Sequence, residues 1–258
     1  MTMRILIVNK FLYLRGGDCV HSLNLKQLLR NAGHDVCFYA MSYSQNIVCE
    51  ENKYFAEEIS FSAKDLQGKI KAASRIIWGI GVVQNFKKLL EEFQPDVVHL
   101  NNIHSYLSPI VAKLAYQRGV KVIWTLHDYK LICPSYSCLC KGNTCEACFT
   151  DKKHVVLRKC MKNSFPASIL AWGEAMNWNK NKLSLWTNSF ICPSQFMAEK
   201  MQQGGYPASK LQVISNFIGE EQVQYIINTP NPIREEAYAY IGRLSQEKGV
   251  ESLLKAAS

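Results

Sequence analysis

Residues 120–126 read VKVIWTL, an almost continuous apolar run of strand length that leads directly into His127. Similar short runs lie on either side of it along the chain, at residues 3–9 (MRILIVN), 97–100 and 189–192, and segments with helical spacing of apolar residues separate them. Strands of this kind that alternate with helices are typical of a parallel sheet covered on both faces. The sequence therefore predicts an α/β fold with a Rossmann-like, doubly wound parallel sheet.

The remaining elements continue this alternation, although two segments are harder to assign. Residues 41–66 are expected to hold a short strand and a loop, and residues 66–93 a single basic helix. The other predicted elements are strands at residues 35–40, 211–215 and 237–241, a helix before Gly33 with Leu25, Leu28, Leu29 and Ala32 on its buried face, a helix before Gly119, and a helix capped by Ser194.

The chain is expected to contain one complete domain and the start of a second. Residues 1–216 form the first domain, and residues 217–236, which include Pro230, are typical of an interdomain linker. Residues 237–258 begin a new α/β unit with one strand and one helix. Because these two elements cannot bury a core by themselves, the sequence predicts a truncated second domain.

The composition excludes several classes of protein. Apolar residues make up 48% of the chain, which supports a buried core, and no apolar run approaches the ~18 residues that a membrane span needs. The N-terminus lacks the basic region and cleavage site of a signal peptide, so a cytoplasmic location is predicted. The formal charge of +9 favours anionic partners, but the basic residues are too dispersed to single out nucleic acid.

Two glycines follow the first predicted strand at the carboxyl edge of the sheet. Glycines in this position let backbone N–H groups approach a phosphate, and the start of the next helix adds a favourable dipole. Gly16 and Gly17 are therefore candidate donor-binding residues, although an ordinary tight turn would use the same pair.

Histidines follow or end other predicted strands at the same edge. His127 and Asp128 come directly after residues 120–126, where a histidine can contact a sugar hydroxyl or assist proton transfer. His99 and His104 lie at the end of another strand and are, with Asp128, candidates for contact with an acceptor. The competing explanation for these residues is a structural hydrogen bond or a solvated loop.

Six of the ten cysteines lie in an insertion at residues 133–160. In a reducing compartment such a cluster more often indicates a metal than disulfides. Structural zinc takes four thiolates, and such an ion has no open position for chemistry, so no catalytic metal is predicted. The alternatives are unliganded cysteines and an iron–sulfur cluster. The best zinc quartet comprises Cys133, Cys145, Cys148 and Cys160, with Cys138 or Cys140 as substitutes.

A segment at residues 165–186 carries three tryptophans and several lysines. Tryptophan suits the membrane interface because its ring is apolar and its N–H is polar, so peripheral contact with the inner membrane face is one interpretation. The other interpretation is an ordinary helix that packs into the core.

Residues 242–249 read GRLSQEKG and lie between the last predicted strand and the last predicted helix. Arg243 and Lys248 can grip a diphosphate at such a turn, Arg243 through its planar fork and Lys248 as a point charge. The spacing alone is equally compatible with exposed basic residues in a loop.

Several motifs then occur in a specific order along the chain: MRILIVNKF with RGG, PDVVHLNNIHSYLSP, TLHDY, ICPSQFMAEKM, VISNFI and YIGRLSQEKGV. Together they resemble retaining glycosyltransferase family four, a large group with the GT-B fold of two Rossmann-like domains. The similarity covers nearly the whole chain.

The resemblance implies an enzyme that moves a sugar from a nucleotide-diphosphate donor to a glycan or lipid-linked acceptor in cell-surface polysaccharide synthesis. It implies that Gly16 and Gly17 lie near the donor phosphates and that His127 faces the donor sugar. Arg243 and Lys248 would neutralise the diphosphate leaving group, because charge builds on the departing oxygen and preorganised cations lower the barrier.

The sequence departs from the family's pattern in one respect. The family's second domain carries a Glu-x7-Glu motif that the chain does not reach before Ser258, so the resemblance implies a donor site that is incomplete as it stands. The alternative function is a non-catalytic, metal-stabilised binding remnant of such an enzyme. A nucleotide-sugar epimerase of the same architecture fits residues 242–249 less well.

Overall fold

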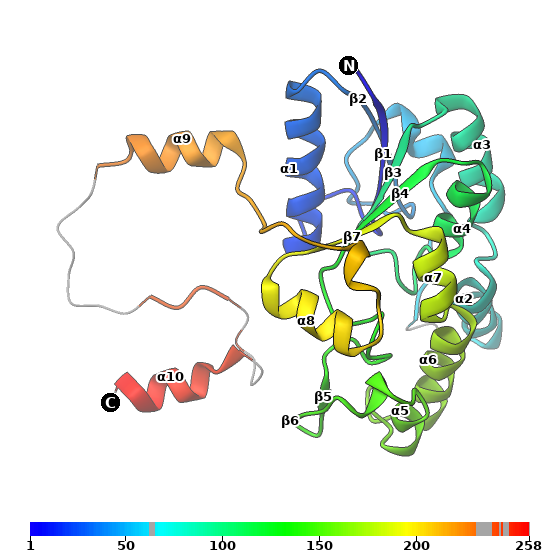
Figure 1. Ribbon diagram of the computed structural model, residues 1–258, viewed down its shortest axis with the longest axis vertical. Helices are drawn as coiled ribbons and strands as arrows, with labels where there is room; N and C mark the ends of the chain where they lie inside the picture. Colours follow the sequence, from blue (N-terminus) through cyan, green and yellow to red (C-terminus); the bar gives the residue numbers. More distant parts are fainter. Residues whose placement is uncertain (62–64, 231–238, 243, 245–247, 258) are drawn as a thin grey trace.

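The computed structural model describes residues 1–61, 65–230, 239–242, 244 and 248–257. Its centre is a parallel sheet of six strands with helices on both sides (Figure 1). This arrangement confirms the predicted Rossmann-like, doubly wound fold. The strands are β1 (Arg4–Val8), β2 (Asp35–Tyr39), β3 (Val97–Leu100), β4 (Lys121–Thr125), β7 (Ser189–Cys192) and β8 (Leu211–Val213).

The order of the strands places a topological switch point in the middle of the sheet. The order is β2-β1-β3-β4-β7-β8, so the chain leaves β1 to one side to form β2 and then returns to form β3 on the other side. Ile5 pairs with Val97 and Val8 with Leu100, which brings the carboxyl ends of β1 and β3 level with each other. Doubly wound sheets bind their ligands at this kind of position.

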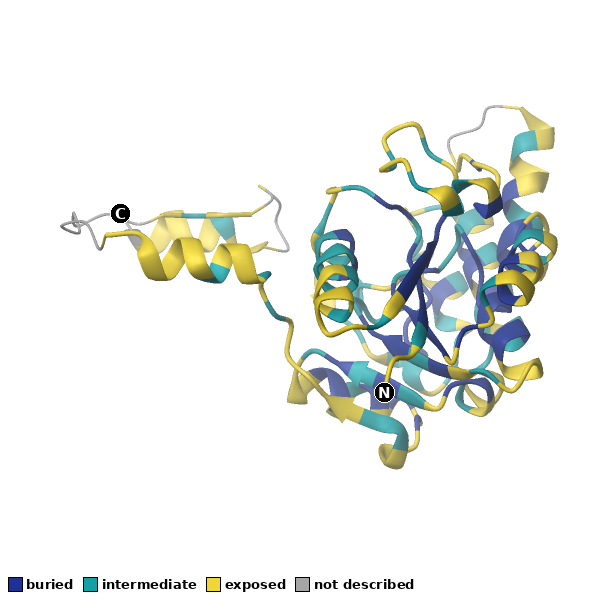
Figure 2. Ribbon diagram, turned by 90° about the horizontal axis from the view of Figure 1, so that it is seen from above, coloured by how far each residue is buried: buried dark blue, intermediate teal, exposed yellow. Residues whose placement is uncertain are grey.

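Helices cover both faces of the sheet, with α1 on one face and α3 and α4 on the other (Figures 1 and 2). The bounds of the longer helices are α1 (Gly17–Asn31), α2 (Leu66–Trp78), α3 (Val83–Phe93), α4 (Ile110–Gln117), α6 (Phe165–Asn177), α7 (Lys180–Trp186), α8 (Gln195–Gln203), α9 (Glu220–Asn228) and α10 (Val250–Ala257). Ser194 caps α8 as predicted, because its hydroxyl accepts a hydrogen bond from the amide of Met197 at 3.2 Å.

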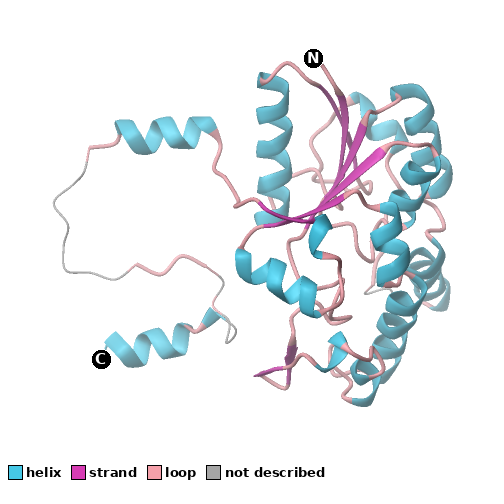
Figure 3. Ribbon diagram, viewed as in Figure 1, coloured by secondary structure: helices cyan, strands magenta, loops and turns pink. Residues whose placement is uncertain are grey.

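The Cys-bearing insertion follows β4 and is built from short elements. These are a two-stranded antiparallel hairpin, visible at the bottom of Figure 3, a single 3-10 turn and one short helix. Their bounds are β5 (Leu139–Cys140), β6 (Asn143–Thr144), η2 (Ala147–Phe149) and α5 (His154–Leu157).

The single helix predicted at residues 66–93 is wrong, because the chain forms α2 and α3 with a break between them. Gly79 ends α2 in the left-handed conformation, with φ at 69°. A Cβ atom at Gly79 would lie 2.4 Å from Cγ2 of Ile110, so the position also lacks room for a side chain. The guanidinium of Arg75 is fully buried beside this break and donates to the carbonyl oxygen of Ile80 at 2.6 Å.

Two other local expectations also differ from the structure. Leu28 was expected on the buried face of α1 but is 52% exposed, and the fully buried side chains of this helix are Cys19 and Ser22. The described residues of this range, 41–61 and 65–66, contain a parallel bridge between Met41 and Ala56 and the 3-10 turn η1 (Glu50–Tyr54) in place of a regular strand.

The C-terminal segment contains the helices α9 and α10. The predicted linker contains α9, whose start is fixed by the side chain of Gln222, which accepts from the amide of Gly219 at 2.8 Å. The predicted strand at residues 237–241 lies partly outside the described residues, and residues 239–241 are not in a strand. Both α9 and α10 lie away from the sheet (Figures 1 and 2). The expectation of a second α/β unit therefore stays a prediction.

Candidate active site at the switch point

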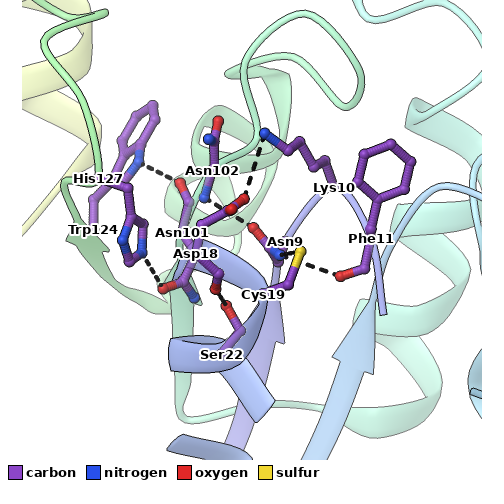
Figure 4. A network of polar contacts seen from close by, with 10 residues as sticks. All are labelled: Asn9, Lys10, Phe11, Asp18, Cys19, Ser22, Asn101, Asn102, Trp124 and His127. Atoms are coloured by element: carbon purple, nitrogen blue, oxygen red, sulfur yellow. Dashed lines mark hydrogen bonds and ion pairs between the residues drawn. The ribbon is translucent and has the colours of Figure 1, made fainter. Parts of the chain in front are cut away.

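A network of polar side chains joins the carboxyl ends of β1 and β3 (Figure 4). The side chain of Asn9, which follows β1, is fully buried, and its Oδ1 accepts from the amide of Asn102 at 3.1 Å. Its Nδ2 donates to the carbonyl oxygen of Phe11 at 3.1 Å. These bonds hold the two loops that leave β1 and β3 in a fixed relative position, so the rim of the switch point is rigid.

His127 belongs to the same network through Asn101. Its Nε2 lies 3.0 Å from Oδ1 of Asn101, and the backbone oxygen of Asn101 accepts from Nε1 of Trp124 at 2.9 Å. Because a carbonyl oxygen only accepts, Nε2 of His127 carries the hydrogen and Nδ1 is left as an acceptor in the neutral ring. A neutral ring of this tautomer can accept a hydrogen bond from a sugar hydroxyl.

A second histidine and an aromatic ring lie beside His127. The rings of His21 and His127 meet edge to face at 5.1 Å between centroids, and Phe217 lies against His21 at 5.4 Å. Burial lowers the pKa of His127 to about 4, with a smaller contribution from His21, and burial also lowers the pKa of His21. Both rings are therefore neutral near pH 7.

The turn that contains Gly16 and Gly17 lies at the start of α1, on the same helix as His21. Gly16 is the N-cap in an extended conformation, and Gly17 is the first helical residue. A Cβ atom at Gly17 would have no described atom within 4 Å, so the turn is open on that side. The first-turn N–H groups of a helix have no intrahelical acceptor and attract anions.

A charged pair lies close to this turn. Asp18 occupies the first turn of α1, and Nζ of Lys10 lies 3.4 Å from its Oδ2. A carboxylate at this position opposes a second anion, and the ammonium of Lys10 offsets its charge. Lys10 therefore keeps the open turn compatible with a phosphate.

The three acceptor-side candidates lie at different depths. His99 is only 8% exposed within β3, its Nε2 lies 2.7 Å from Oγ1 of Thr125, and burial lowers its pKa to about 3, so it supports the site from inside the sheet. His104 stacks on Trp124 at 5.3 Å between centroids. Asp128 accepts from the amide of Lys130 at 2.8 Å, and burial raises its pKa.

Of the two candidate cations of the C-terminal segment, the structure describes only Lys248, which is not part of this network. Arg243 lies outside the described residues. Lys248 is exposed just before α10, which Figures 1 and 2 show away from the sheet. The structure therefore brings His127, Gly16 and Gly17 to one edge of the sheet and leaves Lys248 elsewhere.

The sequence analysis missed Asn9, Lys10, Asp18, His21 and Asn101. Asn9 and Lys10 come directly after the first strand, and Asn101 directly after the strand that ends at residue 100. The rule that ligands bind at the carboxyl ends of strands would have indicated these three positions. His21 gave no such signal, because it lies inside a helix.

The predicted zinc quartet is not assembled. Among the residues that the structure describes, no group of three or more His, Cys, Asp or Glu side chains is placed to hold a metal ion. The four predicted ligands divide between two places. The neighbouring thiols of Cys138 and Cys148 lower the pKa of Cys133. Cys160 contacts Cys140 instead.

Other contacts of the insertion account for sulfur atoms that zinc was expected to bind. Sγ of Cys145 accepts from the guanidinium of Arg158 at 3.0 Å, and Sγ of Cys133 lies 3.2 Å from Oγ of Ser135. The described cysteines are all free of disulfides. The spacing Cys145-x2-Cys148 suggested a metal knuckle, but η2 places these two sulfurs in different surroundings.

Comparison with known proteins places this geometry in a family. The family model described as Glycosyltransferase Family 4 matches residues 15–222, which contain the part of the switch-point network from Asp18 to His127 but not Asn9 and Lys10. The catalytic domain of starch synthase IV from Arabidopsis thaliana, solved with ADP and acarbose, has a similar fold, with a TM-score of 0.50 at 13% identity over 86% of this chain and 53% of that chain.

Two curated proteins are also similar in sequence. One is a glycosyltransferase from Methanosarcina acetivorans, 36% identical over 38% of this chain and 28% of its own length. The other is a 42.6 kDa protein in the cps region of Klebsiella pneumoniae, 24% identical over 71% of this chain and 44% of its own length. The chain thus spans less than half the length of these relatives. Because the family model covers most of its residues, the chain belongs to Glycosyltransferase Family 4.

Proposed function

We propose that this chain acts in the transfer of a sugar from a nucleotide-diphosphate donor to a glycan or lipid-linked acceptor, with retention, in cell-surface polysaccharide synthesis. Membership of the family supports glycosyl transfer. The observation that carries the proposal is the open glycine turn at Gly17 on the same edge of the sheet as the neutral, oriented ring of His127.

Each part of the edge has a defined role in this proposal. The amides of the Gly16–Gly17 turn receive the donor phosphates, because backbone N–H groups at a helix start are preorganised for an anion. Nδ1 of His127 accepts a hydrogen bond from a hydroxyl of the donor sugar and so fixes the sugar beside the bond that breaks.

Arg243 and Lys248 complete the proposal as the cations that neutralise the diphosphate as it leaves. Preorganised positive charge is most effective where negative charge develops in the transition state. This role requires that Lys248 approach the turn when the donor binds, since α10, which directly follows it, lies away from the sheet in the structure (Figure 1). In this proposal these two side chains, and not a catalytic metal, neutralise the negative charge of the departing diphosphate.

The test is a transfer assay with a panel of nucleotide sugars and purified glycan or lipid-linked acceptors. It compares this chain with a form extended beyond Ser258, and it includes His127→Asn in both. The proposal expects transfer that depends on His127 in at least the extended form. Donor binding without transfer in either form would show a non-catalytic binding remnant, and absence of both would overturn the proposal.

A second proposal concerns the membrane, and α6 carries the observation. No helix of the described residues is long and apolar enough to cross a bilayer. Two of the three tryptophans, Trp178 and Trp186, are buried in the core, but Trp172 is 38% exposed. It lies in a stripe along α6, here called the α6 stripe, whose exposed members are Phe165, Ile169, Trp172 and Met176.

The neighbouring helix α2 also has exposed apolar side chains. The end of α6 is bonded to the end of α2, because Nε1 of Trp178 donates to the carbonyl oxygen of Ile76 at 2.8 Å. Leu66 and Ile70 are exposed on α2, and exposed lysines flank both helices. An apolar face rimmed with lysine is typical of a helix that lies in the interface of an anionic membrane. We therefore propose peripheral contact at the cytoplasmic membrane face.

A further inference from the structure

A cavity of about 180 Å³ lies next to the switch-point network, between the Cys-bearing insertion and helices α6 and α7. One of its walls is His104, which stacks on Trp124 at 5.3 Å between centroids. Trp124 in turn donates to the backbone oxygen of Asn101, the residue that orients His127. His104 and Trp124 therefore connect the cavity to the candidate active site.

The cavity contains a buried carboxylate that is only half satisfied. Glu174 on α6 is 4% exposed and lines the cavity. Its Oε2 lies 2.8 Å from Nζ of Lys130, whereas its Oε1 is buried without a hydrogen-bond partner among the described residues. A buried oxygen of this kind costs free energy unless a donor occupies the space in front of it. The missing partner must therefore be a hydrogen-bond donor.

The same cavity carries an excess of positive charge. Lys130, Lys152 and Lys180 all line it, and among the residues that the structure describes Glu174 is the only carboxylate that lines it. Nζ of Lys130 already pairs with Oε2 of Glu174 and donates to the carbonyl oxygen of Pro134, at 2.8 Å each. Lys152 binds the carbonyl oxygen of Ile132 at 2.5 Å, which leaves its charge uncompensated by a carboxylate there. The ammonium of Lys180 lies over Gly205.

These features restrict the chemistry of the occupant. A cation would be repelled by three lysines. A bare inorganic anion has no hydrogen to donate to Oε1 of Glu174 when it is fully ionised. A neutral sugar would satisfy Oε1 through a hydroxyl but would give Lys152 and Lys180 no anionic partner. A ligand with both a hydroxyl and a negative group matches both features.

We propose that this cavity binds one sugar unit that carries a negative charge, either a carboxylate or a phosphate, as the acceptor or part of it. A hydroxyl of this unit donates to Oε1 of Glu174, and its anionic group pairs with Lys152 and Lys180. The volume suits one ring, because it is smaller than the ~300–1,000 Å³ of pockets for drug-sized ligands. The identification of the ligand as an acceptor sugar rests on the proposed function. The requirement for a negative charge and a hydroxyl rests on the cavity alone.

The test is direct binding to the purified chain, without a donor, by saturation-transfer NMR and calorimetry. The probes are glucuronate, glucose 6-phosphate, glucose and sulfate, which is fully ionised at neutral pH and has no hydrogen to donate. The expected result is that at least one anionic sugar binds fivefold or more tightly than both glucose and sulfate. The two anionic sugars distinguish a carboxylate-bearing from a phosphate-bearing unit. Equal binding of all four probes, or of none, would overturn the proposal.

Variants identify the cavity as the place of binding. Lys180→Met is expected to weaken the anionic sugar at least fivefold with an unchanged melting temperature, because Lys180 is exposed. The matched control is Lys182→Met on the same helix, whose ammonium binds the carbonyl oxygen of Asn177 and does not line the cavity. Glu174→Gln is expected to weaken both glucose and the anionic sugar. Equal affinity of the Lys180 and Lys182 variants would contradict the assignment.

The outcome of this test is separable from that of the proposed function. If no sugar transfer is found but the anionic sugar still binds and depends on Lys180, the transfer proposal fails and the cavity stands. If transfer proceeds to neutral acceptors with the same KM in Lys180→Met, the cavity proposal fails and the transfer proposal stands.

Discussion

Nε2 of His127 lies 3.0 Å from Oδ1 of Asn101, so the amide of Asn101 sets both the direction and the tautomer of the ring. Asn101→Asp would place a carboxylate in the same position. Because an adjacent negative charge favours the imidazolium, the pKa of His127 should rise from about 4 towards its ordinary value. NMR titration of the His127 ring measures this shift. Asn31→Asp, at the far end of α1, is the control, and an unchanged pKa in Asn101→Asp would contradict the contact.

The buried histidines also make stability depend on pH in a defined direction. His99 has a pKa of about 3 in the folded chain against an ordinary 6.5, so between these values the unfolded chain binds a proton that the folded chain does not. Stability should therefore fall as the pH drops from about 6.5 towards 3.

His99→Gln removes this proton while its amide can still bond to Thr125. We expect the urea midpoint of the variant to change less between pH 6.5 and pH 4 than that of the unchanged chain. His154→Gln, on the short helix α5, serves as the control. Parallel pH profiles of the His99 variant and the unchanged chain would show that His99 does not contribute to this linkage.

The glycine turn offers a test that separates ligand binding from folding. Gly17→Val adds a side chain into space that no described atom occupies within 4 Å, so the melting temperature should change little. The same side chain would obstruct a phosphate on the turn, and we expect affinity for a nucleotide sugar to fall tenfold or more. Calorimetric titration measures the affinity, and Gly17→Ala should have a smaller effect. Unchanged affinity in Gly17→Val would remove the turn from the donor site.

Arg75 should be among the residues on which stability depends most. Its buried guanidinium donates to the carbonyl oxygens of Ile80 at 2.6 Å, Tyr106 at 2.9 Å and Glu57 at 3.1 Å. Arg75→Met would leave these oxygens without a donor at a cost of roughly 3–5 kcal/mol in the free energy of unfolding. Urea denaturation measures this loss. Lys71→Met, which removes only an exposed ion pair to Glu57, should cost less than about 1 kcal/mol.

The α6 stripe predicts binding to anionic vesicles. Ile169→Glu with Trp172→Glu should abolish co-sedimentation with phosphatidylglycerol vesicles, because two charges replace exposed apolar side chains and would be repelled by the anionic surface. Ile47→Glu with Val48→Glu makes the same change on exposed residues of a distant loop and should leave co-sedimentation intact. If the unchanged chain does not co-sediment, the membrane proposal is wrong.

The sheet was predictable from sequence because its strands are short apolar runs in regular alternation with helices. The break at Gly79 was also predictable, since two glycines lie within three residues there, but the periodicity of residues 66–93 concealed it. Arg75 was not predictable. Its acceptors are backbone oxygens up to 31 residues away, and no residue type marks a carbonyl that will lack a partner.

The candidate site was only partly predictable for a related reason. His127 and the glycines follow strands and so are marked by position alone. The bond between His127 and Asn101 joins residues 26 apart, and it exists only because β3 and β4 are neighbours in the sheet. The zinc quartet failed because spacing along an irregular insertion does not determine where each sulfur lies.

Phe217 has a consequence for whatever follows it in the chain. Its ring packs against His21, so the segment after β8 starts from a fixed origin beside the candidate site. An encounter between later residues, such as Lys248, and a ligand on the Gly17 turn is then intramolecular. It is governed by the effective concentration that this attachment imposes, which dilution of the protein does not change.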